Sequence, residues 1–144
     1  MNIGIIGNAT DKFTVESAQR CKDTIRRLIQ RTPEPTVVSG HCHLGGVDIW
    51  AEEIAKELGV PTLIFAPKDH SWAGPYGYKA RNLDIAKNSD EVHVFVAMTY
   101  PPEYKEMRFD ECYHCRTNDH VKSGACWTMI QAKKLGKRGV QHIV

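Results

Sequence analysis

Short runs of apolar residues alternate along this chain with segments in which apolar residues recur at helical spacing. The run at 2–7 is almost wholly apolar, which is typical of a strand that is covered on both faces of a sheet. Beyond Thr14, a suitable N-cap, Val15 and Ala18 begin a helical face. We expect strands at 2–7, 36–39, 60–66, 91–97 and 139–144. The first helix is expected to begin at 14 and to end before a loop at 32–35, and further helices are expected at 47–58, 78–87 and 124–135.

This alternation of buried strands with helices predicts an α/β fold, because each helix can carry the chain across the sheet to the next parallel strand. We expect one domain, 1–144, with a Rossmann-like three-layer sandwich and a mainly parallel five-stranded sheet. The strand at 60–66 is expected to be buried like the others. The segment 98–122 is too long for an ordinary connection and is interpreted as a Cys/His-containing insertion.

Composition narrows the classes of protein that fit this pattern. The 144 residues carry a net charge of only +2, and the basic residues are scattered, which argues against a nucleic acid partner. No stretch approaches the roughly 20 apolar residues of a membrane span, and the N-terminus lacks the pattern of a secretory leader. The five cysteines, an odd number, suit a reduced compartment. We therefore expect a cytoplasmic protein without a membrane partner.

Glycine-bearing turns follow the first and second expected strands and precede the last expected helix. Glycine lets backbone N–H groups approach a phosphate, and the start of a helix favours negative charge. The alternative is that these glycines only permit tight turns. Asp48, in the second turn, can either bind a ribose hydroxyl or cap the N-terminus of its helix. The candidate ligand-binding residues of these turns are Gly7, Asn8, Ser39, Gly40, Gly45, Gly46, Asp48, Ser123 and Gly124.

A second group of candidate ligand-binding residues lies at the start of the helix expected at 78–87. Lys79, Arg81 and Asn82 offer an ammonium, a guanidinium and a carboxamide, which bind phosphate oxygens and the edges of bases. A surface ion pair or an ordinary first helical turn explains the same residues equally simply. Nearby, Trp72 offers a ring for stacking on a base or for covering the edge of the sheet.

Four residues with metal-binding side chains lie close together in and beyond the 98–122 insertion. Cys112 and Cys115 form a CxxC pair, and His120 and Cys126 follow within a short distance. Three thiolates and one imidazole complete a tetrahedral zinc site, which would staple the long insertion. The alternative is a set of free thiols in a reduced cell, because a second CxxC or HxxxH spacing is missing.

Taken in order, these motifs resemble the SLOG superfamily of Rossmann-like proteins, which includes the DprA/Smf and LOG-type proteins, and in particular its YspA-like branch. The resemblance covers nearly the whole chain. Its most specific part is AGP at 73–75 followed by RN at 81–82, and further parts are GNATD at 7–11, the glycine-rich turn at 38–48 and SGA at 123–125, which is similar to the family's SGT.

The resemblance implies that the protein binds nucleotides or signals derived from them, often as a homodimer. LOG-type members are phosphoribohydrolases, which release a base from a nucleoside monophosphate and use the glutamate of a PGGxGTxxE motif. That motif is not intact here, because Thr128 falls at the position of the glutamate and a shifted register brings in Gln131. Neither residue supplies a carboxylate, which weakens the hydrolase interpretation.

Three hypotheses for function follow. The first is a module that binds or senses a nucleotide-like small molecule, of the ADP-ribose or nucleoside monophosphate type. The second is an N-glycosidic hydrolase or transferase that uses a carboxylate from elsewhere, for which Asp11, Glu16 and Asp48 are candidates. The third is an interaction protein that is stapled by zinc.

Overall fold

The computed structural model describes residues 1–144 and contains one sheet of five strands, all parallel, in the order β3-β2-β1-β4-β5. The predicted Rossmann-like α/β fold is therefore confirmed. The strands are β1 (Asn2–Gly7), β2 (Thr36–Ser39), β3 (Thr62–Ile64), β4 (Glu91–Val96) and β5 (Arg138–Ile143). The helices are the short 3-10 helix η1 (Thr10–Lys12), α1 (Val15–Arg31), α2 (Val47–Glu57), α3 (Tyr78–Asn88) and α4 (Ala125–Lys134).

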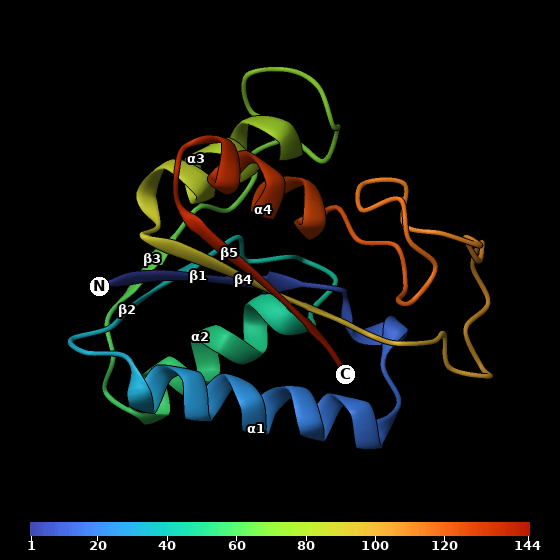
Figure 1. Ribbon diagram of the computed structural model, residues 1–144, viewed down its shortest axis with the longest axis horizontal. Coiled ribbons are helices and arrows are strands. Elements are labelled where there is room, and N and C mark those ends of the chain that lie inside the picture. The colour runs from blue at the N-terminus through green and yellow to red at the C-terminus, as the bar shows by residue number, and fades with distance from the viewer.

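The helices form two layers, one on each side of the sheet. Helices α1 and α2 pack together below the sheet in Figure 1, and α3 and α4 pack together above it. Helix α1 begins with a capping box, in which the Thr14 side chain accepts from the Ser17 N–H at 3.0 Å and the Ser17 hydroxyl accepts from the Thr14 N–H at 2.9 Å. No helix of this protein combines the length and the apolar character that crossing a membrane requires.

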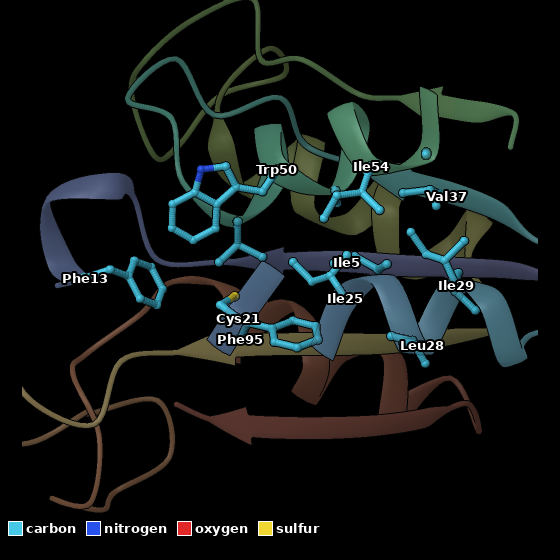
Figure 2. Close-up of a cluster of buried hydrophobic side chains, with 14 of the residues drawn as sticks. Ile5, Phe13, Cys21, Ile25, Leu28, Ile29, Val37, Trp50, Ile54 and Phe95 are labelled. Atoms are coloured by element: carbon cyan, nitrogen blue, oxygen red, sulfur yellow. The ribbon is translucent and has the colours of Figure 1, made fainter. Parts of the chain in front are cut away.

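Each face of the sheet has its own core. Figure 2 shows the core beneath α1 and α2, where Ile25 and Ile29 point from α1 toward the sheet and the rings of Phe13 and Trp50 meet edge to face at 5.1 Å. The core on the other face is smaller and includes two cysteines of the predicted metal site, Cys112 and Cys126, both fully buried. Each buried aliphatic side chain stabilises the fold by about 1.5–3 kcal/mol.

The third strand differs from the prediction. We expected a buried strand at 60–66, but β3 has only three residues, and Thr62 and Ile64 are exposed. The reason is its position at the edge of the sheet, where it pairs with β2 alone. An apolar sequence does not distinguish a central strand from an edge strand, since both can be rich in β-branched residues.

The strand order places a switch point between β1 and β4. From β1 the chain moves to β2 and β3 on one side, and later returns to β4 and β5 on the other side. Ligands of open parallel sheets bind beyond the carboxyl ends of the strands at such a point. The long segment 98–122 leaves β4 at the same end of the sheet and folds back toward α4 (Figure 1).

Candidate functional site

A cavity of about 360 Å³ lies beyond the carboxyl ends of β1 and β4, at the switch point. Residues from the turns after β1, β2 and β4, from the start of α3 and from the start of α4 surround it. The lining residues are Ile6, Gly7, Asn8, Ala9, Lys12, Cys42, Asp48, Trp72, Tyr78, Arg81, Asn82, Ile85, Tyr100, Tyr104, Phe109, Lys122, Ser123, Gly124 and Ala125.

The buried side chain of Asn8 holds the turns around this cavity together. Its Oδ1 accepts from the Ala97 N–H at 3.0 Å, and its Nδ2 donates to the carbonyl of Lys122 at 3.1 Å. These bonds join the end of β1 to the residue after β4 and to the end of the long insertion. Asn8 therefore acts mainly through the backbone that it positions.

The glycine-rich turn after β2 packs so closely against the turn after β1 that position 46 accommodates only glycine. This glycine has a φ of +90°, and a Cβ there would overlap the carbonyl oxygen of Asn8. The same oxygen accepts a hydrogen bond from the N–H of Val47, the first residue of α2, at 3.2 Å. The second turn thus needs glycine because backbone packs directly on backbone.

Asp48 places a buried carboxylate in the wall of the cavity. It lies in the first turn of α2, is only 4 % exposed, and accepts a hydrogen bond from the Gly7 N–H at 3.3 Å. Burial raises the pKa of Asp48 to about 6, although the guanidinium of Arg81 and the N–H groups of Gly7 and Cys42 act in the opposite direction. It is the one acidic residue among the nineteen that line the cavity.

Arg81, in the first turns of α3, lines the same cavity as Asp48. Its Nη1 donates to the carbonyl oxygen of Gly40, and its Nε donates to Asn82 Oδ1 at 2.8 Å. A Cβ on Gly40 would meet both the Arg81 guanidinium and a carboxylate oxygen of Asp48. Glycine at this position therefore lets the cation and the buried acid approach each other.

Cations and aromatic rings make up much of the remaining wall. Lys12 Nζ lies 5.0 Å from the centre of the Tyr104 ring, and Lys122 Nζ lies 4.8 Å from that of Phe109. Arg81 stands 5.4 Å from the Tyr78 ring centre. Three cations and one carboxylate thus line the cavity, and Lys12 is also paired with Asp11 at 2.9 Å. The rings beside them offer surfaces for stacking.

The structure brings together seven of the twelve predicted ligand-binding residues in this lining: Gly7, Asn8, Asp48, Arg81, Asn82, Ser123 and Gly124. The other five do not line it: Ser39, Gly40, Gly45, Gly46 and Lys79. Ser39 is fully buried, and its hydroxyl donates to Glu52 at 2.9 Å. Lys79 is an exposed residue of α3.

Several lining residues were not among the sequence candidates. Lys12 and Lys122 are isolated lysines, and Phe109 lies in the irregular insertion. The one available signal was the length of the insertion, since long loops in compact domains often carry function. Helix α4 supplies no carboxylate to the cavity, because it contains no acidic residue, and neither Thr128 nor Gln131 lines the cavity.

The predicted metal-ligating residues do converge. The ligand atoms of Cys112, Cys115, His120 and Cys126 all lie within 4.8 Å of one another, and three of the four residues are buried. This Cys3His cluster can hold a metal ion. All five cysteines of the chain are free thiols, and the remaining two, Cys21 and Cys42, lie elsewhere.

Neighbouring groups orient the ligands of this cluster. His120 Nδ1 lies 2.8 Å from the Val121 carbonyl oxygen, so Nδ1 carries the proton and Nε2 keeps its lone pair for the cluster. Burial acts to raise the pKa of the Cys112 thiol, but backbone N–H groups of Ser123, Cys115 and His114 outweigh it and hold that pKa below its usual value.

Comparisons of the chain with protein-family models, with curated proteins and with solved structures found no match. The resemblance to the SLOG superfamily therefore stays a prediction from the motifs.

Proposed function

We propose that the cavity at the switch point binds a nucleotide-like small molecule of the ADP-ribose or nucleoside monophosphate type. The observation that carries this proposal is the composition of its wall, in which three cations, the start of a helix and several aromatic rings face one space. Anionic groups and flat rings are the two chemical features that such a wall recognises. Nucleotides combine both.

The phosphate would bind near the start of α4. Ser123, Gly124 and Ala125 line the cavity there, and the partial positive charge at a helix N-terminus favours an anion. Lys122 is adjacent, and Arg81 supplies a guanidinium that suits phosphate oxygens. Neither cation is paired with a carboxylate in a salt bridge.

The base would stack on the aromatic part of the wall. Trp72 is 43 % exposed, and its ring centre lies 5.2 Å from that of Trp127 in an edge-to-face contact. This contact fixes the orientation of the Trp72 ring. Tyr78 and Tyr100 add further ring surface. A volume of about 360 Å³ lies within the range of small-molecule sites, roughly 300–1,000 Å³.

A panel of nucleoside monophosphates, NAD and ADP-ribose tests this proposal. The purified protein is incubated with each compound, freed of unbound material and denatured, and the released compounds are identified by mass spectrometry. Retention of at least one intact compound is expected. Retention of none would contradict the proposal.

Arg81→Ala sharpens the test, with Lys79→Ala as its matched control. Loss of a hydrogen bond to a charged group costs about 1.5–3 kcal/mol, so Arg81→Ala is expected to weaken binding of the retained compound roughly 10- to 150-fold. Lys79→Ala removes a nearby charge outside the cavity and is expected to change affinity less than twofold. Equal losses in calorimetric titrations would place the anion elsewhere.

Cleavage of the N-glycosidic bond is a second candidate function. Of the three candidate acids, Asp48 is the one whose position in the cavity wall suits this reaction. Asp11 and Glu16 are exposed and do not line the cavity. An ionised Asp48 would stabilise positive charge on the ribose as the base departs with the bonding electron pair, and water would then supply hydroxide to the sugar carbon and a proton to the base. Release of free base by the native protein, but not by Asp48→Asn, is the expected result.

The homodimer that the resemblance implies is also part of the proposal, and sedimentation equilibrium tests it. The interpretation as an interaction protein makes a different prediction, namely that metal binds while every nucleotide in the panel fails to bind.

A further inference from the structure

We infer that Cys112, Cys115, His120 and Cys126 bind one Zn²⁺ ion tetrahedrally, and that this ion fixes the insertion against α4 as a wall of the cavity. Three thiolates and one imidazole form a common closed zinc set, and closed sets of this kind have structural roles. The ion would join the insertion, which contains the first three ligands, to α4, which contains Cys126.

The spacing of the ligand atoms fits such a site. In a tetrahedral site with Zn–S bonds of about 2.3 Å, sulfur atoms lie roughly 3.8 Å apart. All four ligand atoms lie within 4.8 Å of one another, so movements of about an ångström complete the geometry. The turn that carries the first two ligands is closed by the Cys112 N–H, which donates to the Thr117 carbonyl at 2.8 Å, and by the Arg116 N–H, which donates to the Cys112 carbonyl at 2.7 Å.

The side chain of Gln141 shows how closely three of the ligand atoms converge. The Gln141 amide nitrogen lies 3.3 Å from Cys115 Sγ, 3.4 Å from Cys126 Sγ and 3.1 Å from His120 Nε2. An amide nitrogen carries two hydrogens, so it cannot donate fully to three acceptors. Three ligand atoms, two sulfurs and one imidazole nitrogen, therefore lie around one point, which is the arrangement that a single bound cation requires.

The sequence between two of the ligands forms part of the cavity wall. Lys122, Ser123, Gly124 and Ala125 lie between His120 and Cys126, and all four line the cavity. Tyr104 and Phe109, which precede the ligands in the insertion, line it too. An ion that fixes both ends of 120–126 therefore fixes this wall, and the importance of that wall for ligand binding rests on the proposed function.

Metal analysis under reducing conditions tests the site directly. Protein purified without chelator is expected to contain one zinc per chain, and the metal-free protein titrated with Co²⁺ is expected to show the strong visible bands of tetrahedral cobalt with thiolate ligands. Absence of zinc together with absence of these bands would overturn the inference, as would one equivalent of a metal other than zinc.

A pair of variants assigns the ligands. Cys115→Ser is expected to lower zinc affinity at least tenfold, whereas Cys42→Ser, which changes a cysteine of similar intermediate exposure outside the cluster, is expected to leave the zinc content at one per chain. Loss of zinc in both variants, or in neither, would overturn the assignment.

Limited proteolysis of the native protein tests the wall. Lys105, Arg108 and Arg116 are exposed in the insertion, and chelation is expected to speed tryptic cleavage there at least tenfold. An unchanged cleavage rate after full removal of zinc would overturn the structural role. No nucleotide is present in any of these measurements, so their failure is distinct from failure of the nucleotide panel.

Discussion

The cavity and the Cys3His cluster lie side by side, but they are assembled in different ways. The cavity collects side chains from positions as distant as Ile6 and Ala125, and three of them, Asn8, Asp48 and Arg81, already have hydrogen-bond partners within the fold. The cluster collects all its ligands from 112–126 and brings the four ligand atoms within 4.8 Å of one another. A site built from distant segments depends on the whole fold, whereas a local site can itself stabilise the segment that contains it.

Removal of metal is expected to have the largest effect, because it tests whether the local site stabilises its segment. A ligand present at 1,000 times its Kd stabilises the folded state by about 4 kcal/mol, so chelation of tightly bound zinc should lower the Tm by roughly 10 °C. Differential scanning calorimetry measures this change, and added zinc should reverse it. A Tm that is insensitive to chelation would remove the proposed difference between the two sites.

Asp48 is expected to produce the next largest effect, because its burial ties the cavity to the stability of the whole fold. Burial raises its pKa to about 6, so between about pH 4 and pH 6 the folded state keeps a proton that the unfolded state has lost. The contribution of Asp48 to the free energy of unfolding is therefore present at low pH and falls by roughly 3 kcal/mol as the pH rises through this window.

Urea unfolding of the native protein and of Asp48→Asn, from pH 4 to pH 7, isolates this contribution. The native protein should lose stability relative to the variant as the pH rises, while the other titrating groups contribute equally to both curves. Parallel curves would mean that Asp48 does not titrate from a buried position.

Gly46→Ala is expected to show the smallest effect of the three and tests the close approach of the two turns. Both Gly46 and Gly59 have positive φ, of +90° and +68°, but a Cβ at Gly59 would meet open space. Gly46→Ala should therefore lower the free energy of unfolding by roughly 2 kcal/mol more than Gly59→Ala, because only the former adds a clash to the backbone strain. Equal losses in chemical denaturation would show that the turns separate easily.

The regular elements could be predicted because their signals are local. The bounds of β1 and β2 agree with the prediction, as does the capping role of Thr14, because a strand period or a cap depends on residues near in sequence. The convergence of the Cys3His cluster was predictable for the same reason, since its spacing lies within one short stretch.

The cavity lining was predicted only in part because it depends on contacts between distant residues. Arg81 was recognisable as a charge at the start of a helix, but its approach to Asp48 depends on Gly40, in a turn that is remote in sequence. Lys12 and Phe109 carry no local signal at all. The exposed β3 shows the same limit, because the pattern of a strand does not state which neighbours it will have.

The strand order gives the chain a natural line of division. The segment 68–76 is exposed throughout, and a cut there would leave β1, β2 and β3 on one fragment and β4 and β5 on the other. The β1–β4 ladder, from Ile3 opposite Glu91 to Gly7 opposite Phe95, would be the seam between them. Asp48 and Arg81 would then lie on different fragments, so a ligand bound between them would promote reassembly by mass action. Under the proposed function, reconstitution of the two fragments would report the concentration of the nucleotide-like ligand.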